Sequence, residues 1–81
     1  ARYPRAMRYR VEFLREATEE ESVCFSRAAR TAHLALAELQ AEAWAADAHR
    51  FYGARGFQIR DLHADKIVCL ASFETKPPRI N

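Results

Sequence analysis

Residues 31–52 read TAHLALAELQAEAWAADAHRFY, and Gly53 follows them. The stretch is dense in alanine, leucine, glutamate and glutamine and holds no proline or glycine, which favours an α-helix. Gly53 suits the left-handed residue that ends many helices. Thr31 or Ser26 is expected to cap the start, because hydroxyl side chains accept hydrogen bonds from the first backbone N–H groups. We therefore predict a helix from about Thr31 to Tyr52.

The helical period divides the apolar residues of this stretch into two stripes. The inner stripe carries the large aromatic residues and is predicted to pack on a sheet. It consists of Leu34, Ala37, Ala41, Trp44, Ala48 and Phe51, with Ala45 and Tyr52 beside it. The outer stripe lies roughly opposite and consists of Ala32, Leu36, Leu39, Ala43 and Ala46. Glu38 and Glu42 separate the two stripes on one side.

The outer stripe has two interpretations. One sheet covers only one side of a helix, so the outer stripe is predicted to contact another copy of the chain or another protein. Alternatively, it is a by-product of an alanine-rich helix, since exposed alanines and single exposed leucines are normal on protein surfaces. The small size of the chain favours the contact, and its predicted residues are Leu36, Leu39, Ala43 and Ala46.

Alternating apolar and polar residues predict strands on both sides of the helix. Residues 8–14 predict a half-buried first strand, and residues 22–26 predict either a short second strand or the beginning of the helix. Residues 57–60 and 67–73 predict the third and fourth strands, joined by a short turn at 62–66. Tyr9, Val11 and Phe13 share the face of the first strand that is expected to be buried.

These elements predict an α+β fold, in which one long alanine-rich helix packs on one face of a small antiparallel sheet. The predicted order is ββαββ, or βαββ if the second strand is absent. We expect a single domain over residues 1–81, with an acidic turn at 15–21 and a tail at 76–81. Residues 1–7 are expected to be a disordered arm. Because Met7 is the only methionine, the residues before it are also explained as a remnant of expression or as an upstream extension.

The amino-acid composition indicates a small globular domain. The chain has 81 residues, 49% hydrophobic and 30% charged, which is typical of one globular domain with a thin core. No apolar stretch resembles a signal peptide or a membrane span, so a cytoplasmic protein without membrane contact is expected. Two cysteines, Cys24 and Cys69, are too few for a disulfide scaffold and are expected to be buried and inert.

Basic residues near the start of the chain predict an alternative function. The net charge is only +2, but arginines alternate with tyrosines before residue 11, and such strands bind single-stranded nucleic acid in other folds. Arg8, Arg10 and Arg60 are the candidate contacts for this alternative. The acidic residues between 16 and 21 oppose it, and so does the absence of any nucleic-acid-binding signature.

No pattern predicts a catalytic site, a metal site or a cofactor. The three histidines and two cysteines lack the spacings of known metal motifs. Asp61, His63 and Asp65 alternate, but a turn of polar residues explains them equally well. The sequence therefore predicts a small, non-enzymatic protein-interaction module that acts as a homodimer. The dimer is expected to form through the helix or, as the competing route, through edge-to-edge pairing of strands, above all the last strand at 67–73, whose two faces are apolar. The alternative is a small nucleic-acid-binding domain that uses its arginine-rich first strand.

Overall fold

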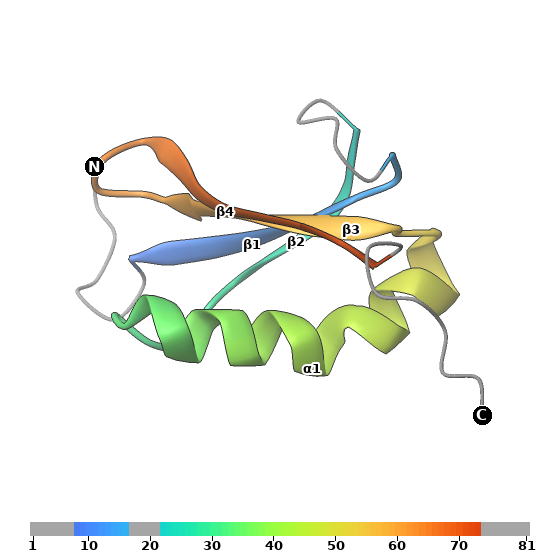
Figure 1. The fold of residues 1–81 in the computed structure, drawn as a ribbon, viewed down its shortest axis with the longest axis horizontal. Coiled ribbons are helices and arrows are strands. Elements are labelled where there is room, and N and C mark those ends of the chain that lie inside the picture. Colours follow the sequence, from blue (N-terminus) through green and yellow to red (C-terminus); the bar gives the residue numbers. More distant parts are fainter. Residues whose placement is uncertain (1–7, 17–21, 74–81) are drawn as a thin grey trace.

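The computed structural model describes residues 8–16 and 22–73. Their elements, in chain order, are β1 (Tyr9–Leu14), β2 (Val23–Ala28), α1 (Leu34–Tyr52), β3 (Gly56–Asp61) and β4 (Lys66–Ser72). The strands form one antiparallel sheet in the order β2-β1-β3-β4, and α1 lies along one face of it (Figure 1). The predicted ββαββ fold is confirmed.

The alternative order βαββ is wrong, because residues 23–28 pair with β1 instead of beginning the helix. The predictions for the arm at 1–7, for the acidic residues 17–21 and for the tail at 76–81 lie outside the described residues. Within the described ranges, no helix combines the length and the apolar character that a membrane crossing requires.

The central strands β1 and β3 supply the large side chains of the core. Val11 and Phe13 of β1 lie opposite Ile59 and Phe57 of β3, and all four point toward the helix with at most 5% of their surface exposed. Tyr9 is also buried, as its place in the alternating pattern predicts. Burying each such side chain contributes about 1.5–3 kcal/mol, so these two strands dominate the stability of the sheet.

The helix meets these large residues with small ones. Ala37, Ala41 and Ala48 are the buried residues of α1, and each has at most 2% of its surface exposed. Because a methyl group occupies little space, the helix axis can approach the sheet closely at these positions. The inner stripe is therefore confirmed for its alanines, while Leu34, Trp44 and Ala45 are half-buried along its borders.

The prediction for Phe51 is wrong, because this side chain is 66% exposed. The buried face is centred on the three alanines, and Phe51 is rotated about 60° from Ala48 around the helix. Tyr52 is rotated about 40° the other way, and its ring stacks on Phe25 of β2 at a centroid distance of 4.4 Å. The last turn of α1 therefore packs through Tyr52, and Phe51 points away.

The start of the helix also differs from the prediction. The helix begins at Leu34 and His33 is its N-cap, without a side-chain hydrogen bond to the cap. Thr31 lies two residues earlier and accepts a hydrogen bond from the His33 N–H at 3.1 Å, while Ser26 belongs to β2. The tight connection from β2 places Thr31 before the helix, so its hydroxyl stabilises the entry turn instead.

The end of the helix follows the prediction. Gly53 adopts the left-handed conformation, with φ of 74°. The N–H of Gly53 donates to the His49 carbonyl at 3.0 Å, and the N–H of Ala54 donates to the Ala48 carbonyl at 3.2 Å. These two bonds satisfy carbonyl groups that the helix end would leave unpaired.

Two phenylalanines allow the core to be tested with matched chemistry. Phe13→Ala removes a fully buried ring and is expected to lower the free energy of unfolding by about 3–5 kcal/mol. Phe51→Ala removes an exposed ring and is expected to lower it by less than about 1 kcal/mol. Denaturant melts of both variants measure the difference. A loss of about 3 kcal/mol or more from Phe51→Ala would show that the helix turns this side toward the sheet.

Candidate interaction surfaces

The four predicted contact residues of the outer stripe all lie on the exposed side of α1. Leu36 is 47% exposed and Leu39 is 60% exposed, while Ala43 and Ala46 follow them on the same side of the helix. Ala32, the first residue of the predicted stripe, precedes the helix and is also exposed. Two large apolar side chains and two methyl groups thus form a continuous surface that faces away from the sheet.

The borders of this surface differ in character. Gln40 borders one side, where its Oε1 accepts a hydrogen bond from the Arg30 N–H at 2.8 Å. Glu42 is exposed on the other side, while Glu38 is half-buried and near enough to the Cys69 thiol of β4 to raise its pKa. The polar groups beside the outer stripe therefore hold the helix to neighbouring segments and do not cover the leucines.

Sequence reasoning missed the contact between the last turn of α1 and the edge strand β2, where the Tyr52 ring stacks on Phe25 and is still 43% exposed. Val23, the first residue of β2, is 41% exposed. Further along the same flank, the Arg27 guanidinium lies over the Trp44 ring, 4.2 Å from its centroid. The spacing of four residues from Ala48 to Tyr52 is the signal that could have placed Tyr52 here.

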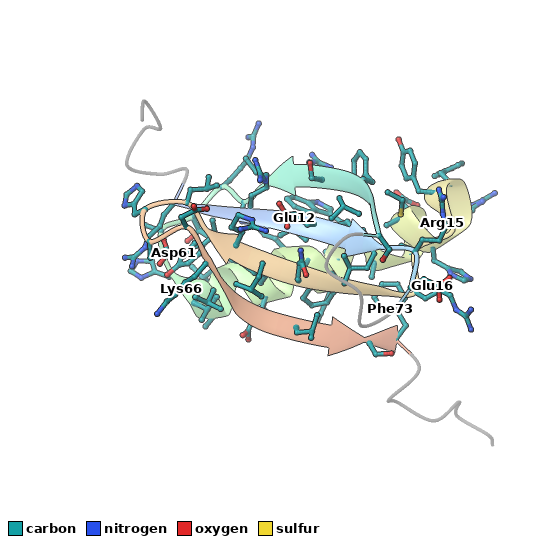
Figure 2. All side chains as sticks on the ribbon, turned by 90° about the horizontal axis from the view of Figure 1, so that it is seen from above. Glu12, Arg15, Glu16, Asp61, Lys66 and Phe73 are labelled. Atoms are coloured by element: carbon teal, nitrogen blue, oxygen red, sulfur yellow. The ribbon has the colours of Figure 1, made fainter. Side chains whose placement is uncertain are left out.

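The sheet face opposite the helix carries a cluster of charged and polar side chains. Figure 2, which views this face, shows Glu12 in the middle of the sheet. Arg10 approaches the Glu12 carboxylate at 2.8 Å and Arg60 approaches it at 3.3 Å. Gln58 donates from Nε2 to the same carboxylate at 2.7 Å. Glu12 is only 4% exposed, so these partners replace the water that it has lost.

Asp61 forms a second polar centre at the end of β3. Its carboxylate pairs with Arg8 at 3.0 Å and accepts hydrogen bonds from the backbone N–H groups of His63 and Ala64. Asp65, in the same turn, has a left-handed φ of 57° and lies 3.6 Å from Arg60. Asp61 therefore holds the turn before β4 in place.

The three arginines of the nucleic-acid alternative come together at this end of the sheet. Arg10 and Arg60 are direct cross-strand partners, and Arg8 precedes β1. However, each of the three is paired with a carboxylate, from Glu12, Asp61 or Asp65. These pairs offset the positive charge locally and use guanidinium donors that a phosphate would need.

Two carboxyl groups have pKa values below their ordinary range. Burial alone would raise the pKa of Glu12, but hydrogen bonds from Gln58 and Arg10 and the charge of Arg60 outweigh it, and the pKa is lowered. The hydrogen bond from Arg8 lowers the pKa of Asp61, and the N–H groups of the turn assist it against burial. Both groups therefore favour the folded state in their ionised form.

The two cysteines cannot form a pair, because they lie on β2 and β4 at opposite edges of the sheet. Both are free thiols and are half-buried, less buried than the sequence predicts. Burial, together with the carboxylates of Glu38 and Glu42, raises the pKa of the Cys69 thiol to about 11. This thiol is therefore protonated at neutral pH and a poor nucleophile.

Over the described ranges, no three histidine, cysteine or acidic side chains converge in a way that could hold a metal ion. Asp61, His63 and Asp65 alternate in sequence, but the Asp61 carboxylate is bound to the backbone of the turn and to Arg8. The alternation is thus explained by a structured turn.

No family model, curated protein or solved structure matches this chain.

The lowered pKa values predict how stability depends on pH. Glu12 and Asp61 stabilise the folded state above their unfolded pKa values of about 4.3 and 3.9, and this contribution is lost as the pH falls through the lower folded values. Glu12→Gln is expected to lower the free energy of unfolding by about 1–3 kcal/mol at pH 7. It should also flatten the loss of stability below about pH 4.5.

Urea melts between pH 7 and pH 2 measure both effects. Asp47→Asn replaces an exposed carboxylate on α1 and serves as the matched control, with the wild-type dependence on pH expected. A Glu12→Gln variant that loses stability in acid as steeply as the wild type would contradict the assigned role of Glu12.

Proposed function

We propose that this chain is a non-enzymatic protein-interaction module that forms a homodimer through the outer stripe of α1. The observation that carries the proposal is the exposure of Leu36 and Leu39 on the side of the helix turned away from the sheet. The leucines stand beside Ala43 and Ala46, whose small side chains leave room for a second helix.

The order of residues along the stripe suits pairing with its own copy. In an antiparallel pair of helices related by a two-fold axis at the level of Ala41, Leu36 lies opposite the partner's Ala46. Leu39 then lies opposite the partner's Ala43, so each large side chain meets a small one. Both contacts are repeated by the symmetry, as an isologous interface requires. The antiparallel arrangement also sets opposite ends of the two helix dipoles together.

The size of the domain supports the same conclusion. A chain of 81 residues builds a thin core, and a symmetric interface is a common way to bury more apolar surface. At about 25 cal/mol per Å², covering two leucines per subunit contributes several kcal/mol before the entropy cost of association. A dimer of moderate affinity is therefore expected.

The non-enzymatic part of the proposal rests on the polar side chains. Glu12 and Asp61, the buried carboxylates of the described residues, are held by arginines and by turn hydrogen bonds, and the Cys69 thiol has a raised pKa. Carboxylates that are paired in this way stabilise the fold, and neither they nor a protonated thiol act readily as a base or nucleophile toward a substrate.

Opposite charges on the outer stripe provide the test. Leu36→Glu combined with Leu39→Lys keeps the net charge and buries no new group, so the fold should remain intact while the dimer is lost. Sedimentation velocity is expected to show a folded monomer for this variant and a dimer for the wild type. His63→Glu with Ala64→Lys adds the same two charges to an exposed turn and should stay dimeric. A wild-type chain that is monomeric at millimolar concentration, or a double variant that remains dimeric, would refute the helix interface.

The nucleic-acid alternative through Arg8, Arg10 and Arg60 has weaker support, because carboxylates already pair with each arginine. A labelled single-stranded oligonucleotide, titrated at low salt, is expected to show no saturable binding at protein concentrations of about 50 μM. Binding that weakens steeply with salt, and that Arg10→Ala and Arg60→Ala reduce, would favour the alternative instead.

A further inference from the structure

The strand β4 forms one edge of the sheet, and most of its length carries no charge. Among the described strands it pairs with β3 alone, and it is the outermost strand in Figure 2. Its charged residue is Lys66 at the first position; from Ile67 to Ser72 it contains no charged residue and no proline, and none of these residues is fully buried. Proteins usually protect such an edge with charges or proline, because unpaired backbone N–H and C=O groups attract another strand.

The opposite edge of the sheet carries a charge within the strand. Arg27 of β2 places its guanidinium over the Trp44 ring, and inward-pointing charges on an edge strand keep foreign strands away. Bulges do not distinguish the two edges, because the register shifts between Phe13 and Leu14 beside β2 and between Ile59 and Arg60 beside β4. The position of Arg27 within β2, against the uncharged stretch from Ile67 to Ser72, therefore favours β4 as the edge that is open to pairing.

The two faces of β4 differ in chemistry at this edge. Leu70 lies opposite Gln58 on the face away from the helix and is 50% exposed. Cys69 lies opposite Ile59 on the helix side, where the Glu38 and Glu42 carboxylates are near enough to raise the pKa of its thiol. An added strand would lie about 4.8 Å beyond β4, so its side chains on the helix side would reach these two carboxylates.

We propose that the outer edge of β4, from Ile67 to Ala71, binds an extended segment of a partner polypeptide in which basic and apolar residues alternate. The backbone of the segment pairs with β4 and continues the sheet. Its basic side chains meet Glu38 and Glu42, and its apolar side chains pack beside Leu70. This site goes beyond the proposed homodimer, since it uses a different surface and a different partner.

A second copy of the chain fits this edge less well. Two β4 strands paired antiparallel about a two-fold axis would bring both helices to the same face of the joined sheet. The carboxylates of Glu38 and Glu42 from both copies would then lie near one another on that face. Repulsion between these like charges opposes association. A basic strand meets the same carboxylates with opposite charge, so charge complementarity selects it.

A designed peptide provides the test. The probe is a seven-residue peptide of alternating lysine and valine, added to ¹⁵N-labelled protein and followed by the shifts of backbone amide signals. Saturable shifts are expected at Ile67–Ser72. A matched peptide with glutamate in place of lysine should bind at least about tenfold more weakly. Glu38→Gln with Glu42→Gln should weaken the lysine peptide about fivefold, as the loss of two exposed ion pairs implies.

Two controls separate strand pairing from simple charge attraction. Two N-methylated forms of the lysine peptide test backbone pairing, one methylated on the lysines and the other on the valines. The N–H groups of the two sets point to opposite edges of an extended strand, so only the form whose methyl groups face β4 should fail to bind. Repeating the titration with the Leu36→Glu, Leu39→Lys variant should leave the affinity unchanged, whatever becomes of the homodimer. Glu42→Gln alone, at an exposed position, replaces the double variant if that one unfolds, with about twofold weaker binding expected.

Four results would overturn the proposal. The first is the absence of saturable binding at millimolar peptide, and the second is peptide-induced shifts that map to Val23–Ala28 or to α1 instead of β4. The third is a set of shifts at Ile67–Ser72 that appears when the protein alone is concentrated, which would assign the edge to a second copy. Equal affinity for the lysine and glutamate peptides would also refute it, because Glu38 and Glu42 would then select nothing.

Discussion

The structure depends on the fit between three alanines of α1 and the large side chains of β1 and β3. Ala37, Ala41 and Ala48 are buried against a surface that includes Phe13 and Ile59. The sheet supplies the large side chains, and the small alanines allow the helix to lie close to them. A larger residue at any of the three alanines would therefore push the helix and the sheet apart.

The exposed apolar surfaces follow from this fit. A helix that buries only its alanine side must place its larger residues elsewhere, and α1 places Leu36 and Leu39 outward and Tyr52 on the flank above Phe25. The sheet likewise extends beyond the helix, which packs mainly on β1, β3 and β2 and leaves β4 at the side. The outer stripe of α1 and the edge of β4, the two surfaces proposed for recognition, are thus the parts that packing one helix on the sheet leaves uncovered.

The face of the sheet away from the helix differs, since its charged groups pair with one another, although the buried Oε1 of Gln58 has no hydrogen-bond partner. Glu12 lies under two arginines and a glutamine, and Asp61 is enclosed by Arg8 and the following turn. Charges that neutralise one another stabilise this face but give it little attraction for a charged ligand. Recognition is therefore expected at the helix and at the sheet edge, where apolar groups and two carboxylates remain accessible.

The sequence by itself determined the elements, because their signals are local. The alternation in residues 8–14, the uninterrupted helical stretch before Gly53 and the alternation after Gly56 each depend on neighbouring residues alone, and all produced the expected elements. The tertiary structure decided what periodicity cannot: the strand order, the exposure of Phe51 and the pairing of Arg8, Arg10 and Arg60 with carboxylates. These depend on contacts between residues that are distant in the chain. A rotation of the helix by a fraction of a turn, which leaves every local preference unchanged, exchanges Phe51 for Tyr52 at the sheet.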